Sequence, residues 1–111
     1  MKTYAMTINL RDSPGIIDRY KQYHLSVWPE VISALNGIGV LNMKIFLQNV
    51  SLFMYMETED HFEPDRDFKL YTQYPRAKKW DDLMRSLQKP VSGVKEGEWW
   101  ASMEEVFDIN W

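Results

Sequence analysis

Residues 20–30 read Tyr-Lys-Gln-Tyr-His-Leu-Ser-Val-Trp-Pro-Glu, and this stretch decides how the first half of the chain folds. Tyr20, His24 and Trp28 follow one another at four-residue steps, so a helix would place them on one face. Apolar residues recur around them at helical spacing, at Ile17, Val27, Val31 and Leu35. We therefore expect this face to turn toward the core.

Pro29 interrupts the same helical pattern. Its ring clashes with the carbonyl of Leu25, and it has no backbone N–H to donate. The residue before a proline is also biased away from helical geometry, which here affects Trp28. The sequence predicts a kink or break at 26–28, with a second short helix over 29–36.

The rest of the chain alternates between strand and helix patterns. Apolar and polar residues alternate over 4–10, after which Ser13 is the expected N-cap of a helix with Pro14 in its first position. Strands are further expected at 41–47 and 52–57 with a hairpin turn near 48–51, then a loop at 58–67, a helix at 75–87 and a last strand at 98–109.

The order strand–helix–strand–strand–helix–strand is typical of a ferredoxin-like α+β fold, with helices on one face of an antiparallel sheet. The 111 residues suit a single domain spanning 1–111. Large apolar residues also lie on the other face of the sheet, where they would form an exposed patch. A second copy packed sheet to sheet would cover this patch, so we expect a homodimer.

Composition excludes several classes of function. The net charge of −3 and the lack of a basic stripe argue against a nucleic-acid partner. The chain has no cysteine and only two histidines, His24 and His61, so we expect no metal site. No apolar run is long enough to span a bilayer, and a cytoplasmic protein without membrane contact is the expectation.

His24 is unusual because an imidazole within an apolar stripe needs partners for two ring nitrogens. A histidine in such a place is often a core residue that bonds a backbone carbonyl. The phenol of Tyr20 one turn earlier and the indole of Trp28 one turn later favour a small ligand pocket instead. Trp28 and Trp80 fit a purely structural role in the core at least as well as they fit a role in ligand binding.

The motif Tyr-x-x-x-His-x-x-x-Trp-Pro-Glu, formed by residues 20–30, resembles that of the L-rhamnose mutarotase family. The resemblance continues through 41–46 (Leu-Asn-Met-Lys-Ile-Phe), 52–57, the helix containing Trp80, and 103–107 (Met-Glu-Glu-Val-Phe). It thus covers nearly the whole chain. The resemblance implies a dimeric α+β barrel that interconverts the α and β anomers of a 6-deoxy sugar, with no cofactor and no metal.

The resemblance also implies roles for single residues. His24 matches the proton donor of the family, Tyr20 a sugar-binding tyrosine, and Trp80 the second of a pair of sugar-binding tryptophans. Met43 stands where better-known members have a sugar-contacting tyrosine, and Lys79 where they have the first tryptophan of the pair. Both departures fall at substrate contacts, so L-rhamnose, L-fucose and other 6-deoxy or pentose sugars stay open.

The chemistry of anomer exchange suits these residue types. A proton must leave the anomeric hydroxyl and another must reach the ring oxygen, and an imidazole that titrates near neutral pH can do either. The faces of Trp28 and Trp80 suit the C–H faces of a sugar, and Asn42 offers an amide for its hydroxyls. Candidates for a second proton-handling group are Tyr20, Asn42, Glu104 and Glu105.

Two other classes of function compete with the mutarotase. A cofactor-free or haem-dependent oxygenase on the same dimeric barrel would also combine a helix histidine with Trp and Asn in a cleft. A ligand-binding regulator would use the pocket without chemistry. The combination of Tyr20, His24, Trp28, Pro29 and Glu30 favours the mutarotase.

Overall fold

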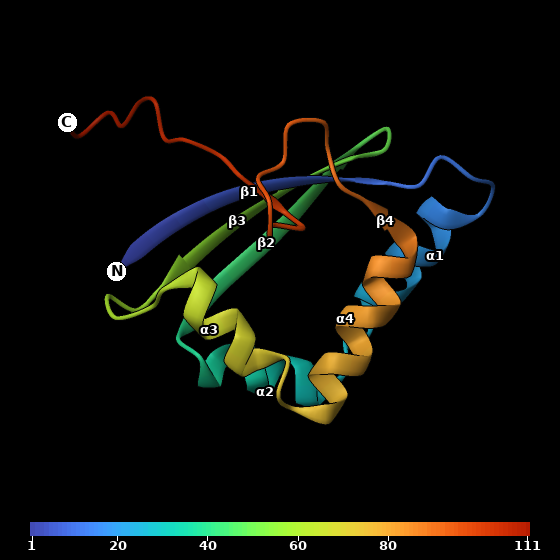
Figure 1. Cartoon of the computed structure of the whole chain (residues 1–111), viewed down its shortest axis with the longest axis horizontal. Helices are drawn as coiled ribbons and strands as arrows, with labels where there is room; N and C mark the ends of the chain where they lie inside the picture. Colours follow the sequence, from blue (N-terminus) through green and yellow to red (C-terminus); the bar gives the residue numbers. More distant parts are fainter.

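Strand β1 (Lys2–Leu10) is an inner strand of the sheet and pairs with other strands along both of its edges. In the computed structural model, which describes residues 1–111, β3 pairs along one edge of β1, and β4 and β5 share the other edge (Figure 1). In chain order the elements are β1, α1 (Ile16–Leu25), α2 (Pro29–Gly37), β2 (Val40–Gln48), β3 (Ser51–Thr58), α3 (Pro64–Tyr71), α4 (Pro75–Leu87), β4 (Gln88–Lys89) and β5 (Ala101–Ser102).

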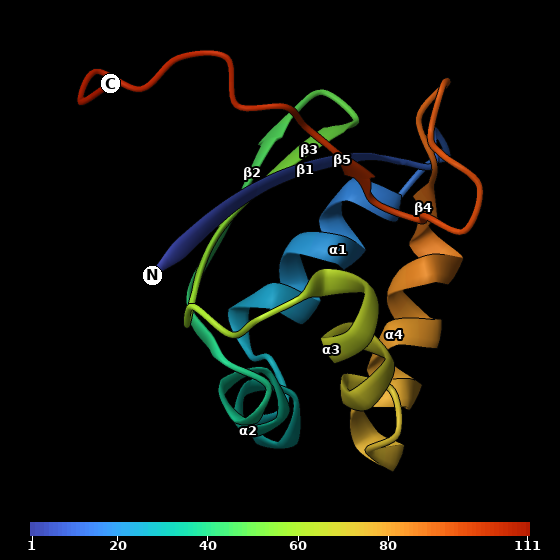
Figure 2. The same ribbon diagram turned by 60° about the vertical axis from the view of Figure 1, so that its left-hand side comes forward.

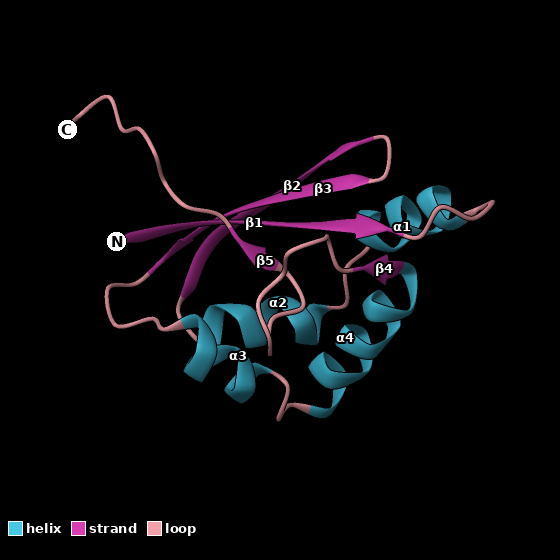
Figure 3. Ribbon diagram, turned by 45° about the horizontal axis from the view of Figure 1, so that its top comes forward, coloured by secondary structure: helices cyan, strands magenta, loops and turns pink.

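The sheet has the strand order β2-β3-β1-β4, and all of its pairings are antiparallel. The helices lie together on one side of the sheet, and the other side is free of helices (Figures 2 and 3). This confirms the expected α+β fold of the ferredoxin-like type.

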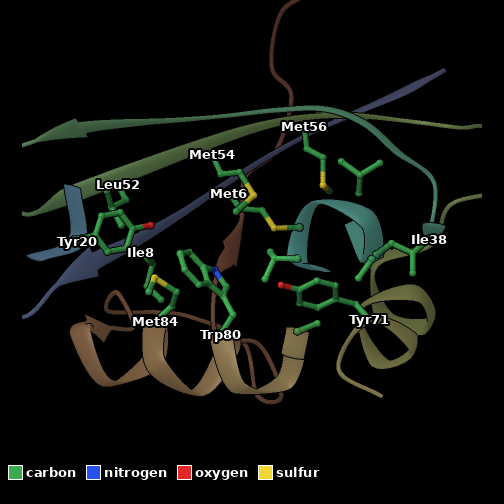
Figure 4. Packing of buried hydrophobic residues seen from close by; sticks show 14 of the residues in the cluster. Met6, Ile8, Tyr20, Ile38, Leu52, Met54, Met56, Tyr71, Trp80 and Met84 are labelled. Atoms are coloured by element: carbon green, nitrogen blue, oxygen red, sulfur yellow. The ribbon is translucent and has the colours of Figure 1, made fainter. Parts of the chain in front are cut away.

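The core lies between the sheet and the helices because alternate residues of each strand turn toward the helices. The buried residues of the sheet include Met6, Ile8, Leu10, Leu52, Met54 and Met56. Trp80 and Met84 of α4 and Tyr20 of α1 point at this layer from the helical side (Figure 4). Apolar side chains at a two-residue period thus meet apolar side chains at helical spacing, which is what the sequence pattern predicted.

The predicted break before Pro29 is confirmed. Helix α1 ends at Leu25 and α2 begins at Pro29. Between them Trp28 has φ −57° and ψ 134°, the extended geometry that a following proline favours. The chain therefore turns within three residues and places Trp28 at the junction of the two helices.

The predicted start of the first helix is wrong. Helix α1 begins at Ile16, not at Pro14, and its N-cap is Gly15 rather than Ser13. The segment before it closes a tight turn in which the N–H of Ile16 donates to the carbonyl of Ser13. Gly15 has φ 82°, a left-handed conformation that glycine adopts without strain.

The hairpin at 48–51 is confirmed, with Asn49 in a left-handed conformation at φ 54°. The expected loop at 58–67 is partly wrong, because α3 begins inside it at Pro64. Asp67 explains the difference: its side chain is buried and accepts from the backbone N–H of Glu63 at 2.8 Å and from Arg66. An acidic stretch that composition assigns to solvent thus supplies a helix start.

The expected last strand at 98–109 is also wrong in extent. Only Ala101 and Ser102 form a strand, opposite Thr7 and Met6, and Met103 adds one bond to the carbonyl of Ala5. The following residues form no helix or strand and extend away from the sheet (Figure 2). Alternation predicts extended backbone but not pairing: β4 occupies Asn9 and Leu10, which excludes the start of the predicted strand, and after Met103 the chain leaves the edge of β1.

Candidate functional site

His24 lies in the last turn of α1, four residues before Trp28 and the break between the helices. Its Nδ1 lies 2.8 Å from the carbonyl oxygen of Tyr20, one turn earlier. A carbonyl oxygen only accepts, so Nδ1 must carry the proton of this hydrogen bond. In the neutral ring this leaves Nε2 with a free lone pair, which is the form of a general base.

Burial lowers the pKa of His24 below its ordinary value of 6.5, and the hydrogen bond to the Tyr20 carbonyl opposes this only in part. The side chain is half-buried, so it is removed from bulk water without being sealed in the core. Its physical state at neutral pH is therefore an uncharged imidazole with a fixed tautomer.

Tyr20 packs directly against this imidazole. The two rings stack with centroids 4.2 Å apart and planes 29° from parallel. Tyr20 itself is 4% exposed, and burial raises the pKa of its hydroxyl to about 12, with an opposing effect of the Gln88 side chain that is smaller. The phenol thus stays protonated at neutral pH beside the imidazole.

Trp80 of α4 connects the members of an aromatic group that we call the His24 cluster, made of Tyr20, Tyr23, His24, Trp28 and Trp80. Its ring lies edge-on to His24 at 5.5 Å, to Trp28 at 5.1 Å and to Tyr23 at 6.1 Å. Trp80 is 6% exposed and belongs to the core, whereas Trp28 is half-buried. The structure thus brings together four of the five residues predicted for the site.

Arg76 covers Trp28 on the side of α4. Its guanidinium carbon lies 4.0 Å from the centroid of the Trp28 ring, within the range of a cation–π contact. Its Nε also lies 4.0 Å from a carboxylate oxygen of Glu30. Two charged side chains from α2 and α4 thus border the cluster where the helices meet.

Sequence reasoning missed one member of the cluster, Tyr23, and a hydrogen-bonded pair outside the helix motif, Gln88 and Trp99. Tyr23 lies between the two predicted positions Tyr20 and His24. Its four-residue spacing to the apolar Val27 could have placed it on the inward face of the helix. Gln88 and Trp99 lie outside the helix motif and join through a hydrogen bond of 2.9 Å between Trp99 Nε1 and Gln88 Oε1. Strand pairing sets Gln88 opposite Leu10, so no sequence spacing relates it to the helix motif.

Asn42, the fifth predicted residue, lies elsewhere. It is exposed on the face of β2 that turns away from the helices, and its amide donates to Glu57 at 3.0 Å. Glu104 and Glu105 are exposed beyond the end of β5. Of the four candidates for the second proton-handling group, only Tyr20 lies in contact with His24.

The two departures from the family pattern differ in their surroundings. Met43 is half-buried on β2 opposite Met56, on the side of the sheet that faces the helices. Lys79 is exposed on α4, next to Trp80 in sequence. Met43 is therefore part of the layer that the His24 cluster packs against, and Lys79 is outside it.

Two further observations concern cofactors and membranes. The structure contains no group of three or more His, Asp or Glu side chains placed to hold a metal ion. None of its helices combines the length and the apolar character needed to cross a bilayer.

Comparison with solved structures shows the same fold in other proteins. An L-rhamnose mutarotase from Formosa agariphila matches with a TM-score of 0.71 at 23% identity, covering 98% of this chain and 99% of that one. The tetracenomycin F2 cyclase of Streptomyces glaucescens matches with a TM-score of 0.59 at 13% identity, covering 97% and 98%. At these identities the two likenesses establish the fold.

Comparison of sequences identifies the family as well as the fold. A UPF0734 protein of Dictyostelium discoideum is 45% identical over 99% of this chain and 91% of its own length. An L-fucose mutarotase of Xanthomonas campestris is 28% identical over 99% and 90%, and an L-rhamnose mutarotase of Paraburkholderia phytofirmans 29% over 99% and 97%. The family model for L-rhamnose mutarotase matches residues 3–109. The chain therefore belongs to the L-rhamnose mutarotase family of sugar isomerases.

Proposed function

We propose that this protein interconverts the α and β anomers of a 6-deoxy sugar at the His24 cluster. The observation that carries the proposal is the hydrogen bond from His24 Nδ1 to the Tyr20 carbonyl. It sets the tautomer of the neutral imidazole, in which Nε2 carries no proton, and burial keeps the proton on the phenol beside it. The site thus offers one base and one acid side by side, which is what ring opening requires.

The proposed reaction opens the sugar ring, turns the carbonyl group and closes the ring again. Nε2 of His24 takes the proton of the anomeric hydroxyl while the bond between the anomeric carbon and the ring oxygen breaks. The electrons of the O–H bond form the carbonyl, and the ring oxygen keeps the pair of the broken bond. The carbonyl group rotates, the ring oxygen adds to its other face, and the imidazolium returns its proton to the new hydroxyl.

Tyr20 is the second proton-handling group in this proposal. When the ring opens, its hydroxyl donates to the ring oxygen, and when the ring closes it regains the proton. A phenol is a stronger acid than an aliphatic alcohol even when burial raises its pKa to about 12. The transfer toward the ring oxygen is therefore downhill in the opening step.

The apolar surroundings favour a sugar with a methyl group at its end. The half-buried ring of Trp28 and the edge of Trp80 offer contact to C–H groups, and Met43 lies in the same layer. Relatives along the full chain include an L-fucose and an L-rhamnose mutarotase. These two sugars are accordingly the substrates that we propose, with Asn42 outside the site because it lies on the other face of the sheet.

We also propose that the protein works as a homodimer. Phe46 and Phe53 stack at 6.1 Å on the face of the sheet that carries no helix, with 56% and 37% of their surfaces exposed. The C-terminal segment adds Val106, Phe107, Ile109 and Trp111, each more than 70% exposed. A second copy on this face would remove both apolar surfaces from water.

Saturation-transfer NMR on equilibrated sugars tests the activity. We expect the protein to accelerate exchange between the anomeric protons of L-rhamnose, L-fucose or both. L-mannose and L-galactose are matched controls, because they differ from these two sugars only in a hydroxyl at C6, and they should exchange more slowly. Exchange at the uncatalysed rate for all four sugars, or a Soret band on addition of haem, would contradict the mutarotase.

The pH dependence of the reaction should follow the protonation of His24. The base must be neutral, so kcat/KM falls as pH falls through the pKa of His24 in the free enzyme. Because burial lowers that pKa, the midpoint should lie below 6.5 and the rate should be flat from pH 7 to 8. Rates corrected for spontaneous exchange at each pH measure this, and a midpoint above 6.5 would refute the neutral, desolvated imidazole.

The homodimer is tested by multi-angle light scattering at micromolar concentration. We expect twice the chain mass of 13.3 kDa. Phe46→Glu, on the face without helices, should give a monomer, because it would place a charge in the interface. Leu70→Glu is the control, since Leu70 is 44% exposed on α3 at the opposite side of the molecule and its replacement should leave the dimer intact. A monomeric wild-type protein would disprove the dimer.

A further inference from the structure

Arg76 is a charged side chain that the reaction proposed above does not use. It is the second residue of α4, and its guanidinium carbon lies 4.0 Å from the centroid of the Trp28 ring. Its Nε lies 4.0 Å from a carboxylate oxygen of Glu30. Trp28 is the N-cap of α2 and Glu30 is the second residue of that helix, so one side chain of α4 contacts the start of α2 twice.

The start of α4 gives no local reason for an arginine. The N–H groups in the first turn of a helix form a partial positive charge, which favours acidic side chains there and disfavours basic ones. The first turn of α4 nevertheless contains no acidic residue, whereas the first turn of α2 contains Glu30. The groups that attract the guanidinium of Arg76 are therefore on α2: the carboxylate of Glu30 and the electron-rich ring of Trp28.

Trp80 is the other side chain of α4 that contacts Trp28. Arg76 and Trp80 are four residues apart and therefore lie on the same face of the helix. The rings of Trp80 and Trp28 have centroids 5.1 Å apart and planes at 71° to each other. Trp80 is buried in the core, and its ring centroid lies 5.5 Å from that of His24. The half-buried Trp28 ring is thus held by a core residue that also contacts His24 and by a guanidinium at the border of the His24 cluster.

We propose that Arg76 is a positioning residue that holds the Trp28 ring against Trp80, as the wall on which the C–H groups of the sugar pack. This inference rests on the proposed function and deepens it. Trp28 would contact C–H groups that take no part in ring opening, so its contact is equally strong in the bound sugar and in the transition state. Loss of its position should therefore raise KM and leave kcat unchanged.

Arg76→Met tests the proposal, because it keeps an unbranched apolar side chain and removes the guanidinium. The side chain of Arg76 is 46% exposed, which puts its contact with Trp28 at the weaker end of cation–π interactions. We expect KM for L-rhamnose or L-fucose to rise about two- to fivefold with kcat unchanged. Arg76→Lys restores a positive charge without the planar group and should recover part of the loss.

Arg85→Met is the matched control. Arg85 also belongs to α4, its guanidinium carbon lies 4.9 Å from the centroid of the Trp99 ring, and it pairs with Asp81 at 2.8 Å. The substitution thus removes the same kind of contact from a tryptophan outside the His24 cluster. It should leave KM and kcat unchanged. A rise in KM that is as large in Arg85→Met as in Arg76→Met would overturn the proposal.

A double-mutant cycle shows whether Arg76 acts through Trp28. In a Trp28→Leu background there is no indole ring to position, so Arg76→Met should cause no further rise in KM. If Arg76→Met raises KM by the same factor in the wild-type and Trp28→Leu backgrounds, Arg76 acts independently of Trp28 and the proposal is overturned.

The free protein provides a readout that does not depend on turnover. The indole N–H resonance of Trp28, assigned by its loss in Trp28→Phe, should move in Arg76→Met and stay in place in Arg85→Met. An unmoved Trp28 resonance, or an unchanged KM in Arg76→Met, overturns this inference alone as long as the wild-type protein is active. Absence of anomer exchange in the wild-type protein overturns the proposed function, and this inference with it.

Discussion

The missing N–H of Pro29 is the constraint on which the arrangement of the site depends. It ends α1 at Leu25 and begins α2 four residues later, so His24 lies in a terminal turn and Trp28 lies at the junction in extended geometry. In an uninterrupted helix, Trp28 would continue the stripe of Tyr20 and His24 along the core. The break instead lets its ring meet Trp80 of α4 at 5.1 Å and leaves it half-buried.

In the proposed reaction the chemistry comes from two groups in contact that are uncharged at neutral pH, His24 and Tyr20. Burial disfavours the charged forms of both His24 and Tyr20, lowering the pKa of the first and raising that of the second. Near neutral pH this gives a base without a proton and an acid that keeps its own. In the proposed reaction the two side chains carry opposite charges while the sugar ring is open, and both are neutral again when each proton returns to its source on ring closure.

Local signals in the sequence were enough to predict much of the fold and the grouping of Tyr20, His24 and Trp28 around one stretch of helix. The four-residue spacing of Tyr20, His24 and Trp28 and the position of Pro29 predicted the helix, its break and its buried face. The predictions that were wrong concern elements that depend on contacts between residues far apart in the sequence. The start of α3 depends on the buried Asp67, which composition assigned to solvent, and the last strand ends because the chain leaves the edge of β1 after Met103. Gln88 lies opposite Leu10 because β4 pairs with the end of β1, a placement that no spacing in the sequence predicts.

The central claim is that the neutral imidazole of His24 moves the proton, and exchange NMR of His24→Ala at saturating sugar tests it most directly. The account predicts that bound-state exchange slows by a factor on the order of 10²–10⁴, with sugar binding retained. His61→Ala is the matched control, since His61 is exposed in the loop before α3 and its replacement should leave the rate unchanged. Exchange at the wild-type rate in His24→Ala would contradict the claim and make His24 a core histidine bonded to a carbonyl.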